Sequence, residues 1–362
     1  MSSIVTFGEI MGRLTPPGFL RLRQALPGTL EVTFAGAEAN VAASLSMFGA
    51  DAKFVTALPG NDLADACIST LQATGVASHI VRTDYGRLGL YFVEKGANQR
   101  PSRVTYDRDG SAISQTDPSV YDWTEIFADA QWFHVTGITP ALSRHAADAT
   151  LASVQAAKTL GLTVSCDLNF RGKLWRWEED TPARDLARRV MTEVLPHVDV
   201  LIANEEDCGD VLGIRGEGTN IEAGQLDVER YPEVARQVIS QFPNLDIVAT
   251  TLRQSVSASH NNWGAMLYAS QGDAALFSPQ GEQGYQPYEI RNIVDRVGGG
   301  DAFAAGLIYG LTNADFPSLQ EALDFAVAAS CLAHSVEGDF NFASRSEVEL
   351  LAKGSASGRV IR

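Results

Sequence analysis

Three consecutive glycines, Gly298, Gly299 and Gly300, are followed directly by Asp301 and by a helical pattern of small residues. Glycine allows backbone conformations that aim successive N–H groups into one concavity, and the start of a helix adds unpaired N–H groups and a positive dipole end. Such a combination binds anions. Asp301 at its rim is placed to take the proton of a hydroxyl that attacks phosphorus. The run predicts a phosphotransferase with Asp301 as base, and a glycine turn with an aspartate helix cap is the simpler local alternative.

Polar residues follow a predicted strand that ends at Asp167. In an open parallel sheet, ligands bind beyond the carboxyl ends of the strands. We therefore expect Asn169 and Arg171 to contact substrate and phosphate.

Two further strand ends carry polar residues. Asn204 and Asp207 share a face if a helix begins there, and a carboxylate in that place would bind magnesium directly or through water. A helix cap with acidic residues in the first turn is the alternative. Thr251 and Arg253, at the next strand end, offer a hydroxyl and a positive charge to nucleotide phosphates.

Gly36 and Asn40 lie four residues apart at the start of an amphipathic helix, so they share a face. The asparagine amide offers one acceptor and two donors, which suits sugar hydroxyls. A glycine helix start with a buried, backbone-bonded asparagine explains the pair equally well.

Two β-prone segments, at about 11–35 and 88–116, interrupt the helical pattern and are expected to form a small sheet that acts as a lid or a dimer contact. Strand alternation places Tyr106 and Arg108 on one face, and Tyr91 lies on the other strand of the pair. Two tyrosines and an arginine under a lid suit a polyhydroxy ligand with a carboxylate, which arginine binds through two hydrogen bonds. Solvated edge strands are the alternative.

Elements of two kinds alternate along the chain, which predicts a mostly parallel α/β sheet flanked by helices, in one domain spanning 1–362. The predicted strands are Val5–Glu9, Ala52–Leu58, Gln131–Thr136, Thr163–Asp167, Val198–Ala203 and Ile247–Thr251. The predicted helices are Ala37–Phe48, Asp62–Gln72, Arg144–Leu160, Thr181–Leu195, Glu229–Gln241, Ala302–Leu311 and Ser318–His334. The polar, glycine-containing stretch 216–225 is expected to be a mobile loop.

The composition of the chain limits the classes of molecule that it is expected to bind. The 362 residues are 45% hydrophobic, so a substantial core is expected, and 44 acidic against 28 basic residues give a net charge of -16. That charge argues against nucleic-acid and anionic-membrane partners. Four widely spaced cysteines without metal-ligand spacing, and a start without signal-peptide features, indicate a cytoplasmic protein.

Two common nucleotide-binding signatures are missing from the sequence. No P-loop motif occurs, and no Gly-x-Gly-x-x-Gly follows the first strand. The second absence weighs against an oxidoreductase that binds a dinucleotide. A nucleotide phosphate site must therefore be the late glycine run.

The order of these elements resembles the ribokinase-like (PfkB) carbohydrate kinases over essentially the whole chain, and within them the 2-keto-3-deoxygluconate kinases. The first family signature resembles 36–60 and the second resembles 295–306. The resemblance implies ATP-dependent phosphorylation of a sugar hydroxyl under a β lid. It implies a sugar-acid site made of Gly36, Asn40, Tyr91, Tyr106, Arg108, Arg171 and the base Asp301. It also implies an anion hole at Gly298–Gly300, with Asn169, Asn204, Thr251 and Arg253 toward ATP.

The chain departs from the family pattern around ATP. Gly299 replaces the usual alanine of Gly-Ala-Gly-Asp, Arg296 precedes the run, and Asp207 replaces a glutamate. The resemblance implies Mg²⁺, possible activation by a monovalent cation such as K⁺, and a homo-oligomer through the lid. A kinase for a neutral sugar such as ribose or fructose, or a non-catalytic sugar- or nucleotide-binding regulator, remains the alternative; Arg108 and Arg171 separate the sugar-acid from the neutral-sugar hypothesis.

Overall fold

A computed structural model describes residues 3–204, 206–215 and 228–354 of the chain, and the predicted stretch 216–225 lies outside them. The central sheet has ten strands, of which the seven from β5 to β11 pair in parallel and β12, β13 and β16 add antiparallel. In spatial order the strands are β13 (Ala274–Ser278), β12 (His260–Ala269), β11 (Ile247–Ser257), β10 (Val200–Asn204), β9 (Thr163–Asp167), β8 (Ala130–Thr136), β1 (Ser3–Phe7), β4 (Ala52–Pro59) and β5 (Ala77–Thr83), with β16 (Tyr288–Arg291) paired to β12. The mostly parallel α/β fold predicted from the sequence is confirmed.

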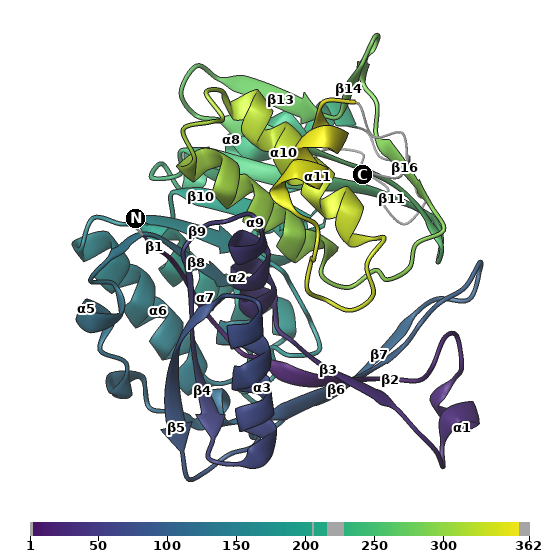
Figure 1. Cartoon of the computed structure of the whole chain (residues 1–362). Coiled ribbons are helices and arrows are strands. Elements are labelled where there is room, and N and C mark those ends of the chain that lie inside the picture. The colour runs from purple at the N-terminus through teal and green to yellow at the C-terminus, as the bar shows by residue number, and fades with distance from the viewer. Residues whose placement is uncertain (1–2, 205, 216–227, 355–362) are drawn as a thin grey trace.

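Helices cover both faces of this sheet (Figure 1). Val5 and Phe7 of β1 enter one core cluster and Ile4 enters the other, because successive side chains of a strand point to opposite faces. One face packs against α4 (Ala112–Gln115), α5 (Trp123–Ile126), α6 (Arg144–Thr159), α7 (Ala183–Val194) and α8 (Tyr231–Gln241). The other packs against α2 (Ala37–Met47), α3 (Asp62–Ala73), α9 (Gly299–Thr312), α10 (Leu319–Ala333) and α11 (Arg345–Ala352). None of the described helices is long and apolar enough to cross a membrane.

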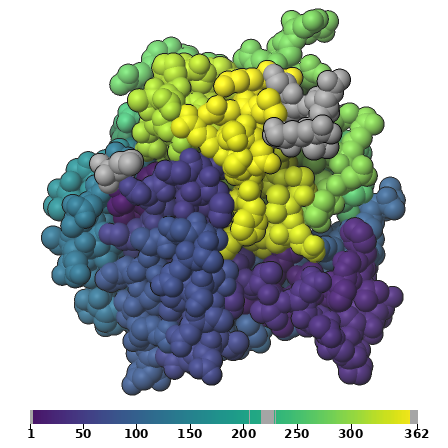
Figure 2. All heavy atoms as spheres, in the orientation of Figure 1, coloured from purple at the N-terminus to yellow at the C-terminus, as the bar shows by residue number. Residues whose placement is uncertain are grey.

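The two β-prone segments pair into a separate four-stranded sheet, which we call the lid sheet (Figure 1). Its order is β3 (Glu31–Ala35), β2 (Met11–Thr15), β6 (Gly89–Glu94) and β7 (Arg103–Asp107), and the short α1 (Leu22–Ala25) lies between β2 and β3 in sequence. The later part of the 88–116 segment differs, since α4 packs against α6 and β4 of the main body. In the space-filling view, the purple lid residues abut the yellow C-terminal segment (Figure 2).

Two element boundaries differ from the prediction with consequences for the site. Helix α9 begins at Gly299, so two of the three glycines and Asp301 belong to its first turn and do not precede it. Strand β11 runs on to Ser257 and forms a hairpin with β12, and residues 253–256 of this extension are exposed. Strands β5, β12, β13 and β16 and the small β14 (Gln280–Gly281) and β15 (Gly284–Tyr285) pair were not among the predicted elements.

Candidate active site

A cavity of about 320 Å³ opens between the lid sheet, the carboxyl ends of the parallel strands and the start of α9. Every site residue named from the sequence lines it, from Gly36 to Asp301, although they come from segments hundreds of residues apart. Those residues are Gly36, Asn40, Tyr91, Tyr106, Arg108, Asn169, Arg171, Asn204, Asp207, Thr251, Arg253, Gly298, Gly299, Gly300 and Asp301.

The glycine run forms the N-terminal end of α9. Gly298 is the N-cap with φ of 85°, in the left-handed region, and a Cβ there would lie 2.2 Å from the carbonyl oxygen of Asp339. Only glycine fits both conditions. A Cβ at Gly300 would meet nothing within 4 Å, so this residue leaves open space beside the unpaired N–H groups of the helix. The helix end can therefore approach an anion closely.

Gly299 occupies the position where the resemblance described above implies an alanine. A Cβ at Gly299 would lie 2.9 Å from Cε1 of the His334 ring, which is buried and packs 5.0 Å from Trp263. The His334 ring therefore accounts for a glycine at position 299.

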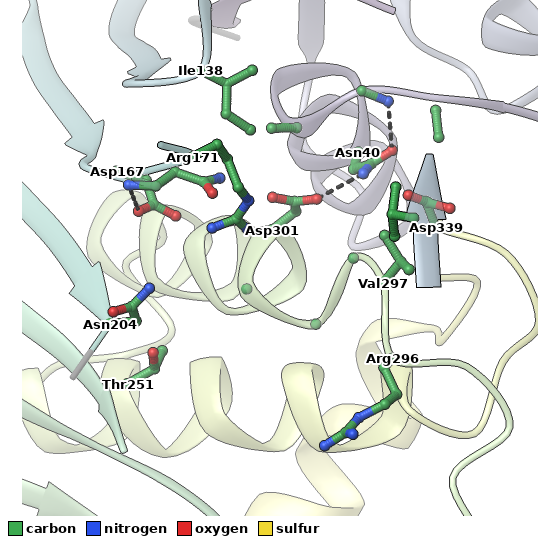
Figure 3. Close-up of a pocket in the computed structure, with 18 of the residues that line it drawn as sticks. Asn40, Ile138, Asp167, Arg171, Asn204, Thr251, Arg296, Val297, Asp301 and Asp339 are labelled. Atoms are coloured by element: carbon green, nitrogen blue, oxygen red, sulfur yellow. Dashed lines mark hydrogen bonds between the residues drawn. The ribbon is translucent and has the colours of Figure 1, made fainter. Parts of the chain in front are cut away.

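Asp301 lies in the first turn of α9 and meets Asn40 of α2 across the cavity (Figure 3). Nδ2 of Asn40 donates to Oδ2 of Asp301 at 2.6 Å. Burial raises the pKa of Asp301 to about 7, reinforced by Asp339 and Glu38 and opposed by the Asn40 hydrogen bond and Arg171. A carboxyl with a pKa near 7 in a cavity is suited to accept a proton at neutral pH.

Asn40 is fixed from both sides. Its Oδ1 accepts from the N–H of Gly36 at 3.2 Å while its Nδ2 holds Asp301. A Cβ at Gly36 would lie 1.9 Å from the carbonyl oxygen of Glu9, so glycine is required for the close approach of the two segments. Asn40 is therefore both bonded to the backbone, as the alternative from the sequence had it, and part of the cavity wall.

The tyrosines face each other across two lid strands. Tyr91 of β6 pairs in register with Tyr106 of β7, and their ring centroids are 6.2 Å apart. The Tyr91 hydroxyl donates to Oδ2 of Asp339 at 2.8 Å, whereas Tyr106 is 36% exposed. Together they provide a flat wall with one fixed polar edge for a sugar.

The two arginines expected to contact the acceptor differ in electrostatic state. Arg108 is buried and forms an ion pair with the buried Glu9, to which its Nε donates at 2.6 Å. Arg171 is exposed, donates to the Phe170 carbonyl at 3.1 Å, and forms no ion pair within the described residues. Figure 3 shows its guanidinium pointing toward Asp301. Its charge opposes the rise that burial causes in the pKa of Asp167, Asp207 and Asp301 without an ion pair among the described residues, whereas the charge of Arg108 is already compensated.

Asn204 and Asp207 cap each other at the end of β10. Asn204 Oδ1 accepts from the N–H of Asp207 at 3.0 Å, and Asp207 Oδ2 accepts from the N–H of Asn204 at 3.0 Å. Oδ1 of Asp207 accepts from the N–H of Phe170 at 3.2 Å. The helix-cap interpretation therefore describes the local bonding, while both residues also line the cavity.

The remaining predicted residues lie on the same side as Asn204. Thr251 and Asn204 pair in register on neighbouring strands and lie side by side in Figure 3. Arg253 lines the cavity two residues further along β11. Asn169, which follows β9, has a φ of 36°, a conformation found at functional sites more often than elsewhere.

Five lining residues whose side chains could take part in binding or proton transfer were not selected from the sequence as site residues. They are Glu9, Asp167, Arg296, His334 and Asp339. Asp167 ends a predicted strand, and that position was a usable signal. Asp339 and His334 have no local pattern that marks them. Arg296 bonds to Ser255 at 3.2 Å and to Asn261.

The acidic residues at the cavity suit a cation. Burial, together with the charges of Asp207 and Asp301, raises the pKa of Asp167 well above its usual value. A divalent ion held largely through water and phosphate oxygens would relieve this repulsion, which fits Mg²⁺. Among the described residues no cluster of three or more metal-ligating side chains occurs, so a site made of protein ligands alone is not indicated there.

Comparison with known proteins gives consistent results. The model of the pfkB family of carbohydrate kinases matches residues 1–344. The chain is 31% identical to the 2-dehydro-3-deoxygalactonokinase of Haloferax volcanii, over 99% of this chain and 98% of that protein. It is 27% identical to the 2-dehydro-3-deoxygluconokinase of Bacillus subtilis, over 93% of this chain and 91% of that protein. The crystal structure of the 2-dehydro-3-deoxygluconokinase of Thermotoga maritima matches with a TM-score of 0.88 and 44% identity, over 98% of this chain and 100% of that one.

Proposed function

The chain belongs to the pfkB family of carbohydrate kinases, and we propose that it phosphorylates 2-keto-3-deoxygluconate (2-dehydro-3-deoxygluconate) at its 6-hydroxyl with ATP. The observation that carries the proposal is the pairing of Asp301 with Asn40 at the N-terminal end of α9. A base and an anion site there share one cavity with the lid tyrosines.

Asp301 accepts the proton of the 6-hydroxyl while the hydroxyl oxygen bonds to the γ-phosphorus. The bond between the γ-phosphorus and the oxygen bridging to the β-phosphate breaks, and ADP leaves. A carboxylate is a sufficient base, because the loose transition state places little charge on the nucleophile before the bond forms. Asn40 holds the Asp301 carboxyl in place through Nδ2.

The N–H groups at Gly299 and Gly300 face the transferring group and stabilise charge on its oxygens. Mg²⁺, when bound with ATP, neutralises phosphate charge. Asp167 and Asp207 are the side chains that would hold its water shell, and Thr251, Asn204, Arg253 and Asn169 lie toward the nucleotide.

The acceptor carboxylate is assigned chiefly to Arg171, because Glu9 already compensates Arg108. Arg108 contributes hydrogen-bond donors, with its guanidinium carbon 5.4 Å from the Tyr106 ring centroid. The same ion pair is the observation that favours the second candidate, a kinase for a neutral sugar such as ribose or fructose, which needs no uncompensated cation.

A coupled ADP-release assay tests the proposal. The panel contains 2-keto-3-deoxygluconate, its C4 epimer, ribose and fructose, each with ATP and Mg²⁺. The highest kcat/KM is expected for 2-keto-3-deoxygluconate. Preference for the epimer would reassign the sugar within the class, preference for ribose or fructose would support the second candidate, and no ADP release with any sugar would indicate a non-catalytic binder.

Three properties complete the proposal. The protein acts in the cytoplasm, as its reduced cysteines suggest. It forms a homo-oligomer through the lid, since Phe19 and Val32 there are 56% and 58% exposed and would be covered. A monovalent cation such as K⁺ raises kcat. Sedimentation velocity of the wild type and Val32→Lys tests the oligomer, and replacement of K⁺ by tetramethylammonium tests the cation.

A further inference from the structure

Arg13 of the lid strand β2 is one of the largest fully buried side chains of the chain, at 1% exposed. Its Nη1 donates to Asp339 and its Nη2 to Asp295, while Nε donates to Thr15 Oγ1 at 3.1 Å. Both carboxylates are buried as well. A buried guanidinium is costly unless such partners satisfy it, so this cluster is a specific arrangement and not a surface contact.

Asp295 connects the Arg13 cluster to the glycine run through hydrogen bonds. Its Oδ1 accepts from the N–H of Arg296 at 2.8 Å and from that of Val297 at 3.3 Å. These are the two residues immediately before Gly298. The orientation of the chain entering α9 therefore depends on a carboxylate that Arg13 holds.

Asp339 connects the same cluster to the wall formed by Tyr91 and Tyr106, which we call the acceptor wall. Its Oδ2 accepts from the Tyr91 hydroxyl at 2.8 Å, its backbone carbonyl lies against Gly298, and its side chain lines the cavity. Arg13 and Tyr91 are in register on the neighbouring strands β2 and β6. One guanidinium thus connects the lid, the acceptor wall and the anion site.

We propose that Arg13 is a positioning residue that couples the lid sheet to the glycine run, so that the acceptor wall and the phosphoryl site form as one unit. This inference rests on the proposed kinase function. Arginine is required because its two terminal nitrogens reach carboxylates on two different segments at once. An ion pair between the buried Lys95 and the exposed Glu337 ties the end of the lid to the same C-terminal loop.

Kinetics of Arg13→Met, Arg13→Lys and the double variant Arg13→Met/Asp295→Asn test the coupling. Arg13→Met is expected to lower kcat roughly 10- to 100-fold and raise KM for the sugar, with KM for ATP unchanged, because a small displacement of reacting groups is costly. Arg13→Lys is expected to recover part of kcat. The double variant neutralises one of the two buried carboxylates that Arg13→Met leaves without their arginine, so it is expected to fold better than Arg13→Met without regaining kcat.

The matched control is Arg87→Met, which removes an exposed lid arginine paired with Asp107 at 2.9 Å. It is expected to leave kcat and both KM values unchanged. A purely structural role for Arg13 would instead lower the Tm and the yield of its variants while kcat per folded molecule stayed normal, and this result would overturn the proposal.

Amide hydrogen exchange provides a readout that does not depend on activity. Peptides covering 296–303 and 89–94 are expected to exchange faster in Arg13→Met than in Arg87→Met. Equal exchange in the two variants would overturn the coupling. If the wild type phosphorylates no sugar of the panel, the proposed function fails, and the exchange data still decide the role of Arg13.

Discussion

The proposed acceptor end of the cavity and the proposed donor end differ in how their positive charges are balanced. At the acceptor end, Arg108 is paired with Glu9, and Arg13 behind the tyrosine wall is paired with Asp295 and Asp339. At the donor end, Arg296 bonds to the neutral Ser255 and Asn261, and burial together with the nearby charge of Arg253 lowers its pKa.

This difference shows two ways of preparing a site. A sugar is recognised by hydrogen bonds whose geometry matters, so its wall is organised in advance by compensated ion pairs. A polyphosphate carries charge, and at its end Arg296 forms no ion pair within the described residues despite the net charge of -16 of the chain. Asp301 and Arg171 lie where the two ends meet (Figure 3).

Asp301→Asn removes the proposed base at the place where the two ends of the cavity meet. We expect kcat to fall by ~10²–10⁴ with little change in KM for the sugar, because the variant keeps the Asn40 contact and loses the base. The ADP-release assay measures this effect. Near-normal turnover would remove Asp301 from its role, and the matched control Asp324→Asn is expected to retain activity.

Arg108→Leu tests whether the acceptor end depends on compensated charge. The substitution leaves Glu9 buried and unpaired, so we expect a loss of about 3–5 kcal/mol in unfolding free energy. The double variant Arg108→Leu/Glu9→Leu is expected to regain most of that stability without restoring the hydrogen-bond donors of Arg108. Urea denaturation measures both, and equal stability of the single and double variants would contradict the pairing.

Arg171→Leu tests a cation that lies where the two ends meet and that forms no ion pair among the described residues. We expect kcat/KM for 2-keto-3-deoxygluconate to fall roughly 10- to 100-fold, as for the loss of a charged hydrogen bond, while any activity on a neutral sugar is preserved. An equal loss on both kinds of sugar would show that Arg171 does not select the carboxylate.

The pH dependence of kcat/KM reports on the same junction. Since burial raises the pKa of Asp301 to about 7, and the base acts when deprotonated, kcat/KM is expected to fall about tenfold per pH unit below that value. A profile that stays flat down to pH ~5, near the ordinary pKa of a carboxyl, would contradict the shift.

The raised pKa of Asp301 also affects folding stability. The stability that the protonated carboxyl contributes is lost as pH rises through this pKa, so Asp301→Asn is expected to have a higher Tm than the wild type above neutrality.

Arg296→Gln tests the uncompensated charge of the donor end. We expect KM for ATP to rise about fivefold and KM for the sugar to stay the same, the size of one hydrogen bond of ordinary strength. Arg291→Gln, an exposed arginine on β16, serves as the control. A change in sugar KM alone would show that the two ends are not separate.

Much of the cavity was predictable because parallel strands end at one edge. Asn169, Asn204 and Thr251 were selected by that rule, and all three line the cavity. The fold followed from alternating elements for the same reason. The start of α9 was harder to predict from the sequence. The left-handed φ of Gly298 and its close approach to the Asp339 backbone appear only in the folded structure.

The ion pairs were not predictable from local pattern. Glu9 and Arg108 are 99 residues apart, and nothing in the spacing of either marks the other. Arg108 was therefore expected to present a free charge to the ligand. His334 likewise explains Gly299 only after the chain has folded α10 against α9.

The Arg13 cluster also has a consequence for how the chain matures during synthesis. Arg13 leaves the ribosome 282 residues before Asp295 and 326 residues before Asp339. Until both have emerged, the lid strand carries a charge without its partners, and contacts of such long sequence separation form slowly. A nascent chain therefore completes its lid only after residue 339 has emerged, and the acceptor wall and the glycine run become functional together at that point.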